Sequence, residues 1–413
     1  MGMTSLDIVI RRARLRGRPT LADIGIRDGT IVALEAGLAQ RGTMELDAGG
    51  NLVTESFVNP HLHLDKVFTL DRAGQDTLTA YHGAGMGEAM AAIERAARVK
   101  AGYAQDWIVE NVRRALRWAL RYGNTHIRAF ADVDPQAGLI GVKALLQARV
   151  EFAGLVHLQV VAFPQDGVVR APGSGDLVRE AVELGADVVG GIAWIEYTEA
   201  DARRHIDEMF AIATASGRPI SMLVDDAGDP GLRTLEMLAV KTLEAGWEGR
   251  VLAQQARAMA LYPPPYLYKV IALLKRARIA IVSNPHTGPL HAPVRTLRDA
   301  GVVVCLGQDD VSDAYYPYGR NNMLEVAFLA SHLLWMTTDA DMEALYDMIT
   351  VDAARAMGVE GYGLRVGGAA HLVVLTVPSV REALRAHEAP AYVISQGKLI
   401  ETPQGDRTQS KSG

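Results

Sequence analysis

Short apolar runs alternate with longer amphipathic stretches from about residue 57 to residue 360. Runs of this kind are typical of buried strands, and apolar positions three and four residues apart are typical of helices. The predicted strands are Leu52–Val58, Thr125–Phe130, Val156–Phe163, Val188–Ile192, Pro219–Val224, Val251–Ala253, Ile279–Val282 and Val302–Leu306. The helices predicted after them are Ala137–Ala148, Gly175–Gly185, Glu199–Ser216, Pro230–Ala245, Pro264–Arg276, Ala292–Ala300 and Asn321–Trp335. Strands alternating with helices indicate parallel βαβ units, and eight strands are the number that a (β/α)8 barrel requires.

An open, doubly wound sheet would produce a similar alternation of strands and helices. Its dinucleotide-binding form carries a Gly-x-Gly-x-x-Gly turn after an early strand. No such motif follows an early strand in this sequence, so we expect the barrel.

Both ends of the chain read as β-structure. Near the start, the runs are Leu6–Ile10, Ile24–Ile26 and Thr30–Leu34; near the end, they are His371–Val377 and Ala391–Ser395. We therefore expect an α/β protein, a TIM-type barrel with a small β-sandwich formed by both termini; two unrelated terminal hairpins are the alternative. The predicted division is 1–56 with 362–402 for the sandwich, 57–361 for the barrel and 403–413 for a disordered, polar tail.

Composition narrows the class of protein. Of the 413 residues, 49% are hydrophobic and 22% charged, as in ordinary globular proteins, and the net charge of −6 lacks the basic footprint of a nucleic-acid binder. The single cysteine, Cys305, excludes an internal disulfide and a cysteine-based zinc site. Neither a signal peptide nor a run of 18 apolar residues is present, so we expect a cytoplasmic protein without a membrane span. The sequence leaves open whether the protein forms a homo-oligomer.

The strongest local signal is the string NPHLHLDK at residues 59–66, where the first predicted strand ends. His61 and His63 are two residues apart, so on extended backbone their rings point the same way and can converge on one cation. Barrel enzymes hold their sites at the carboxyl ends of strands, which favours a functional role. The alternative is a histidine pair that only bonds to nearby backbone.

Two further strands end in polar side chains. Val302–Leu306 leads to Asp309, which could bind a metal or act as a general base; a turn or helix cap is the duller alternative. Val156–Phe163 leads to Gln165, whose amide can both donate and accept, as recognition of a ring amide or urea requires. Because the carboxyl ends of barrel strands meet at one rim, we expect these groups to face the histidines.

Four segments carry a resemblance to a known family: FVNPHLHLDK, HIRAFADVDP, LQVVAFPQDG and LGQDDVSDAYYPYG, at residues 57–66, 126–135, 158–167 and 306–319. They resemble the cytosine-deaminase-like group of the amidohydrolase superfamily, which includes N-isopropylammelide isopropylaminohydrolase. The resemblance extends from about residue 20 to residue 400. It implies a small-molecule substrate, a barrel with a β-sandwich, hydrolysis of a C–N bond, no organic cofactor and one divalent metal, usually zinc or iron.

Residue by residue, the resemblance places His61, His63 and Asp309 on the metal. It places Gln165 on the amide face of the substrate and Tyr315 over the ring. Trp194 and Glu196, which follow another strand, are expected at the same mouth.

The sequence departs from the family pattern at two ligand positions. Leu223 stands where the family has its strand-five histidine, and Gln255 stands where it has a further histidine after strand six. Asp226 stands where the family has a proton-shuttling glutamate, one methylene longer. Leucine has no lone pair, and a neutral amide is a poor ligand for zinc or iron. His286 is the only substitute that the sequence suggests, and a loop histidine is the simpler interpretation of it.

We therefore predict a C–N hydrolase with a degenerate metal site that is weak or absent. Asp309, Asp226 and His63 are its candidate proton-transfer groups. Two alternatives stay open: a metal-independent acid–base enzyme (hydrolase, lyase or isomerase) on the same scaffold, and a binder without catalysis.

Overall fold

The computed structural model describes residues 5–74, 76–81 and 86–401. Eight parallel strands form one sheet, in which each strand pairs with the next along the chain. They are β6 (Phe57–Leu62), β7 (Asn124–Asp132), β8 (His157–Phe163), β9 (Val188–Gly191), β10 (Ile220–Val224), β11 (Val251–Gln255), β12 (Ala280–Ser283) and β13 (Val304–Leu306). The first and last strands meet at a parallel bridge between Leu62 and Asp309, so the sheet nearly closes into the predicted barrel.

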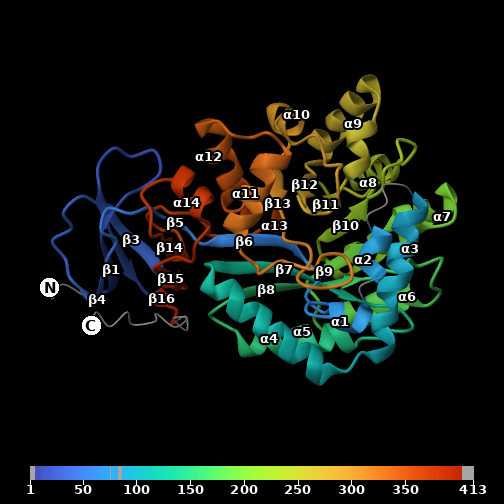
Figure 1. The fold of residues 1–413 in the computed structure, drawn as a ribbon, viewed down its shortest axis with the longest axis horizontal. Coiled ribbons are helices and arrows are strands. Elements are labelled where there is room, and N and C mark those ends of the chain that lie inside the picture. The colour runs from blue at the N-terminus through green and yellow to red at the C-terminus, as the bar shows by residue number, and fades with distance from the viewer. Residues whose placement is uncertain (1–4, 75, 82–85, 402–413) are drawn as a thin grey trace.

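Helices surround this sheet, as Figure 1 shows. Seven follow the strands in the predicted alternation: α5 (Ile140–Glu151), α6 (Ser174–Leu184), α7 (Glu199–Ser216), α8 (Thr234–Glu244), α9 (Pro264–Ala277), α10 (Val294–Asp299) and α11 (Met323–Leu333). The others, which the sequence analysis did not delimit, are α1 (Leu70–Ala73), α2 (Asp76–Tyr81), α3 (Met86–Ala96), α4 (Gln105–Arg121), α12 (Asp339–Met348), α13 (Val351–Met357) and α14 (Val380–Ala386). Within the described chain, every helix is too short or too polar to cross a membrane.

The terminal strands form two four-stranded sheets, at the left in Figure 1. The first contains β1 (Leu6–Ala13), β2 (Ala22–Arg27), β3 (Thr30–Glu35) and β4 (Gly42–Asp47). The second contains β5 (Val53–Glu55), β14 (Leu372–Val374), β15 (Tyr392–Ser395) and β16 (Lys398–Leu399). Ile10 and Ile24 of the first sheet share one buried apolar cluster with Leu372 and Ile394 of the second. The two ends therefore form one β-structure, and the alternative of unrelated hairpins is wrong.

The prediction of Leu52–Val58 as a single barrel strand is also wrong. The run divides at Ser56: β5 pairs with β14 in the terminal sheets, and β6 begins the barrel at Phe57. The side chain of Ser56 bonds to the Thr125 hydroxyl at 2.6 Å at this change of sheet. The polar residues Thr54, Glu55 and Ser56 interrupt the run here, but hydropathy does not report that the chain passes from one sheet to another. We keep 56/57 and 361/362 as proposed domain boundaries; the predicted tail, 403–413, lies outside the described residues.

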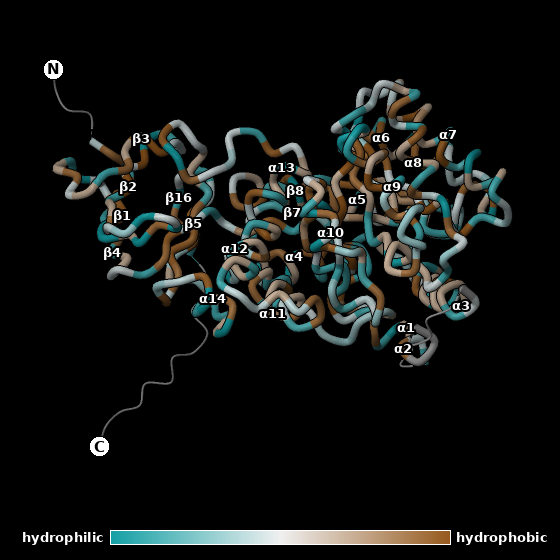
Figure 2. The backbone as a smooth tube through the Cα atoms, turned by 90° about the horizontal axis from the view of Figure 1, so that it is seen from above, coloured by the Kyte–Doolittle hydropathy of each residue, from teal (hydrophilic) through white to brown (hydrophobic). Residues whose placement is uncertain are grey.

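Burial explains why barrel strands such as β10 read as apolar runs, although β7 also buries polar side chains. All residues of β7 and of β10 are buried, because side chains on one face fill the barrel and those on the other meet the helices. In Figure 2, hydrophobic and polar positions mix along the outer helices. The carboxyl ends of the strands are left to present polar groups.

Candidate active site

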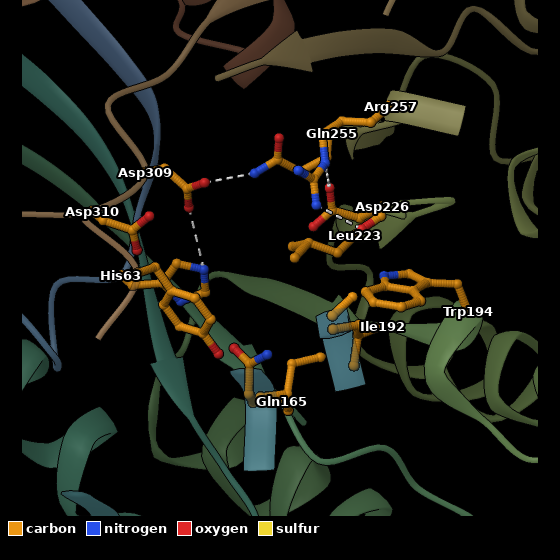
Figure 3. Close-up of a pocket in the computed structure, with 13 residues that line it drawn as sticks. His63, Gln165, Ile192, Trp194, Leu223, Asp226, Gln255, Arg257, Asp309 and Asp310 are labelled. Carbon is orange, nitrogen blue, oxygen red and sulfur yellow. Dashed lines mark hydrogen bonds and ion pairs between the residues drawn. The ribbon is translucent and has the colours of Figure 1, made fainter. Parts of the chain in front are cut away.

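A pocket lies at the carboxyl ends of the barrel strands (Figure 3). It brings together the side chains predicted from separate strands: His63 after β6, Gln165 after β8, Trp194 after β9, and Asp309 after β13. The other lining residues are Ala89, Ile93, Ile192, Leu223, Asp226, Gln255, Arg257, Asp310 and Tyr315. The cavity measures about 40 Å³, enough for a few water molecules.

Asp309 lies between the two histidines. Its Oδ1 is 2.7 Å from His61 Nε2 and 3.5 Å from His63 Nε2, and all three side chains are buried. The backbone holds this arrangement, because the amide of His63 donates to the carbonyl of Asp309 and the amide of Asp309 donates to that of His61, both at 2.8 Å. Asp309 has a left-handed φ of 62°, which is strained for a non-glycine residue and recurs at functional sites.

The surrounding charges and burial determine the protonation states of Asp309 and His63. Burial opposes ionisation, but His61 and His63 outweigh it and hold the pKa of Asp309 well below its usual range. Burial, with Lys66 and His61, holds the pKa of His63 well below its usual range. Near neutral pH, Asp309 is therefore a carboxylate and His63 a neutral imidazole with a lone pair to offer.

Three donors fit a divalent cation at this point. One ligand atom from each of His61, His63 and Asp309 lies within 4.8 Å of the others. Although His61 Nε2 is close to Asp309, neither of its ring nitrogens makes a hydrogen bond of normal geometry with the described residues. Buried ring nitrogens without a hydrogen-bond partner are suited to bind a metal ion. Catalytic zinc sites need only three protein ligands.

Leu223 and Gln255, at the two family positions that usually carry histidine, provide no ligand atom for a cation. Leu223 places an apolar side chain against the pocket, 5% exposed. Gln255 turns its amide nitrogen to Asp309, donating from Nε2 to Oδ2 at 2.6 Å (Figure 3), while its oxygen accepts from the Thr287 hydroxyl at 3.2 Å. The reverse amide orientation would set its oxygen against a carboxylate. Gln255 thus occupies one oxygen of Asp309 as a neutral hydrogen-bond donor.

Asp226 is held on the opposite wall by an arginine. Arg257 donates from Nε to Asp226 Oδ1 at 2.5 Å and from Nη2 to the Asp226 carbonyl at 2.8 Å. Burial raises the pKa of Asp226 to about 6, against the opposing charge of Arg257. A carboxyl in this range can carry a proton near neutral pH, whereas Asp309 cannot.

Gln165 is oriented from behind by a buried lysine. Lys66 Nζ donates to Gln165 Oε1 at 3.1 Å and to Asp132 Oδ1 at 2.9 Å. With its oxygen committed, the amide presents Nε2 as a donor toward the pocket (Figure 3). The group of a ligand that meets Gln165 must therefore be an acceptor.

A compact charge cluster lies behind Gln165. Lys100 Nζ lies 3.0 Å from Asp132, 2.8 Å from Asp134 and 3.0 Å from Asp166. Although burial opposes ionisation, Lys100 and Lys66 hold the pKa of Asp132 at about 2. The cluster anchors the floor of the pocket by ionic contacts rather than by apolar packing.

The remaining predicted residues divide into two groups. Trp194 and Tyr315 line the pocket as expected. Glu196 does not: its Oε1 accepts from the backbone amide of Val168 and lies 2.7 Å from His205 Nδ1, and its Oε2 accepts from the backbone amide of Arg170. These bonds turn its carboxylate toward the loop after β8, so we withdraw Glu196 from the substrate-binding set.

His286 lies close to Asp309, but its nearest partner is Asp310 and not His61 or His63. Its Nε2 is 3.4 Å from Asp310 Oδ2, and it forms a second candidate cluster with Asp309 and Asp310. Sequence reasoning missed Lys66 and Arg257 altogether. Lys66 stands within the quoted family string, which was a signal that could have been used, whereas nothing in the sequence around Arg257 distinguishes it.

Comparison with known proteins agrees with this geometry. The model of the amidohydrolase family matches residues 44–400. N-isopropylammelide isopropyl amidohydrolase of Pseudomonas sp. (strain ADP) is 31% identical over 397 residues, 95% of this chain and 97% of that protein.

Two solved structures share the whole architecture. The crystal structure of 5-methylcytosine deaminase from Klebsiella pneumoniae with 5-fluorocytosine has a TM-score of 0.88 and 30% identity, covering 96% of this chain and 98% of that one. N-isopropylammelide isopropylaminohydrolase from Burkholderia multivorans has a TM-score of 0.84 and 27% identity, with coverage of 96% and 98%. The chain therefore belongs to the amidohydrolase family, a family of hydrolases that act on C–N bonds other than peptide bonds.

Proposed function

We propose that this enzyme hydrolyses the bond between a ring carbon and an exocyclic amino or alkylamino group of a small, planar nitrogen heterocycle. One observation carries the proposal: Asp309, Asp226 and Gln165 line the same small pocket. They supply a base, an acid and an amide donor, which are the functions that this reaction needs. The relatives named for N-isopropylammelide and 5-methylcytosine support the class of substrate.

The two carboxyl groups divide the proton transfers. Asp309, held ionised, accepts a proton from the water that adds to the ring carbon. Asp226, with its pKa raised to about 6, donates a proton to the departing nitrogen as the C–N bond breaks. The products are a ring carbonyl and ammonia or an amine. Two carboxyl groups whose environments push their pKa values apart are typical of an acid–base pair.

His61, His63 and Asp309 are the residues that would hold a divalent cation. Bound there, it would supply a Lewis acid and lower the pKa of water. We propose that such a site is weak, because Leu223 and Gln255 contribute no ligand.

The bond from Gln255 to Asp309 favours a second candidate, a metal-independent enzyme. Acid–base catalysis alone typically contributes about 10²–10⁴-fold, which would restrict such an enzyme to activated substrates, such as imines, enamines or strained rings.

The direct test measures ammonia and amine release from aminopyrimidines and alkylamino-triazines. We would assay the protein as purified, after chelator treatment, and after addition of zinc or iron, with metal content determined in each sample. Turnover that needs added metal supports the weak three-ligand site, and turnover without metal supports the second candidate. Saturable binding of these compounds with no product under any of the three conditions would contradict both and leave a binder.

Replacement of Gln165 by leucine tests the recognition of the substrate. We expect kcat/KM to fall by about 10–100-fold, because a buried hydrogen bond to the ring acceptor is lost at nearly constant volume. Most of the loss should appear in KM, since the bond exists before and during the reaction. Steady-state kinetics on the best substrate measures it, and an unchanged KM would exclude contact between Gln165 and the substrate.

The pH dependence tests the acid role of Asp226. Because the protonated form donates, kcat/KM should fall as pH rises through about 6, the raised pKa of Asp226. The Asp226→Asn variant should be slow and should lack this limb of the profile. A wild-type rate that instead rises through this range would assign Asp226 as a base.

Restoration of the two missing histidines tests the metal interpretation. The Leu223→His, Gln255→His double variant should bind zinc at least tenfold more tightly than the wild type, because two imidazoles join His61, His63 and Asp309. Competition with a chromogenic chelator measures the affinity. Equal affinity in the two proteins would mean that positions 223 and 255 do not face the cation.

A further inference from the structure

A second cavity, of about 700 Å³, lies at the opposite end of the barrel from the candidate active site. Its walls include the residues just before three strands: Asp187 before β9, Arg218 before β10 and Arg250 before β11. Met357, at the end of α13, and Gln396, in the turn between β15 and β16, line it as well. The cavity therefore lies on the side of the barrel where the terminal sheets lie in Figure 1.

Arg128 of β7 is a buried cation in the wall of this cavity. Its side chain is 2% exposed, and its Nε and Nη2 donate to Gln159 Oε1 at 3.0 and 2.8 Å. Nη2 also donates to the Met357 carbonyl at 3.1 Å. All of these acceptors are neutral, and no described carboxylate lies within ion-pair distance, 4.0 Å, of Arg128. A buried charge without a counter-ion is costly, so it points to an anion from outside the chain.

Asp187, an acid in the wall of this cavity, pairs with Arg149 and not with Arg128. Asp187 Oδ2 pairs with Arg149 at 2.8 Å and accepts from the backbone amide of Val160 at 2.9 Å. Arg218 and Arg250, also in the wall, have no described carboxylate within ion-pair distance. Glu360 is the other acid of the lining, and its side chain is exposed. With four arginines against two acids, the lining carries an excess of positive charge.

We propose that this cavity is a binding site for a small molecule carrying at least two negative charges on phosphate or carboxylate groups, held by Arg128, Arg218 and Arg250. Guanidinium groups match both kinds of oxyanion with paired hydrogen bonds. The catalytic machinery of barrel enzymes lies at the carboxyl ends of the strands, so the ligand is an effector or a stabiliser rather than a substrate. Bound between the barrel and the terminal sheets, it would stabilise the folded chain by mass action.

The test uses the full-length protein and three probes: inorganic phosphate, pyrophosphate and citrate. Ionic strength is kept constant with sodium chloride, so that general screening does not change. We expect a saturable rise in Tm and a measurable heat of binding with at least one multivalent probe. Stronger binding of pyrophosphate would identify a phosphate ligand, and stronger binding of citrate a carboxylate ligand.

Variants then assign the binding to the cavity. Arg218→Ala with Arg250→Ala should weaken binding about tenfold or more, because charge-assisted hydrogen bonds are lost. Arg128→Met should abolish it; should this variant fail to fold, the double variant alone decides. Arg203→Ala with Arg204→Ala, which removes two exposed charges of α7, is the matched control and should bind as the wild type does. Absence of saturable binding to all three probes, or an equal loss in the control, would overturn the proposal.

Discussion

Replacement of Asp309 by asparagine is expected to lower kcat/KM by about 10²–10⁴-fold, the usual contribution of a general base. Asparagine keeps the volume but removes the negative charge that faces His61 Nε2 at 2.7 Å and receives the Gln255 amide at 2.6 Å. The variant also loses an anionic ligand of the three-donor site, so its metal affinity should fall as well. Steady-state kinetics and metal competition measure the two effects.

The neighbouring residue supplies a matched control. Burial and the adjacent carboxylates of Asp309 and Asp313 raise the pKa of Asp310 well above its usual range, which favours its neutral form. Asparagine resembles that neutral form, so we expect Asp310→Asn to lower kcat/KM by less than tenfold. Equal losses in the two variants would refute the assignment of Asp309 as the base. A thermal melt of each variant separates lost activity from lost fold.

The second large effect is on stability. Replacement of Lys100 by methionine leaves the carboxyl groups of Asp132, Asp134 and Asp166 without the cation that contacts all of them within 3.0 Å. Removal of one partner from a buried ion pair typically costs about 3–5 kcal/mol, because the remaining charge stays buried. We expect a loss of this size in the free energy of unfolding, measured by urea titration.

Lys143→Met provides the comparison for Lys100, because Lys143 is exposed on α5. Exposed substitutions of this kind usually change stability by about 0.5 kcal/mol or less. A loss below about 1 kcal/mol in Lys100→Met would mean that the carboxyl groups simply take up protons or water. The charge cluster would then not anchor the floor of the pocket, and the orientation of Gln165 would need another explanation.

Local pattern was enough to predict most of the barrel. The strands around Thr125–Phe130 and Val156–Phe163 appear as β7 and β8, and the helix predicted over Glu199–Ser216 has the same bounds as α7. The prediction failed at Ser56, where one predicted strand spans a change of sheet, and in β4, where the pattern is weak and the buried apolar residue is Leu46. Hydropathy reports burial and periodicity, not the sheet to which a strand belongs.

The sequence by itself determined that His63, Gln165 and Asp309 would meet, because each follows a strand and parallel strands in a barrel end at one rim. Only the tertiary structure decided which way side chains beyond the strands turn. It directed Glu196 to the loop after β8, set the Gln255 amide on Asp309, and placed Lys66 behind Gln165. It also gathered Arg128, Arg218 and Arg250 around one cavity. These contacts join residues far apart in the chain, so their geometry depends on how loops and strands pack, which no local pattern records.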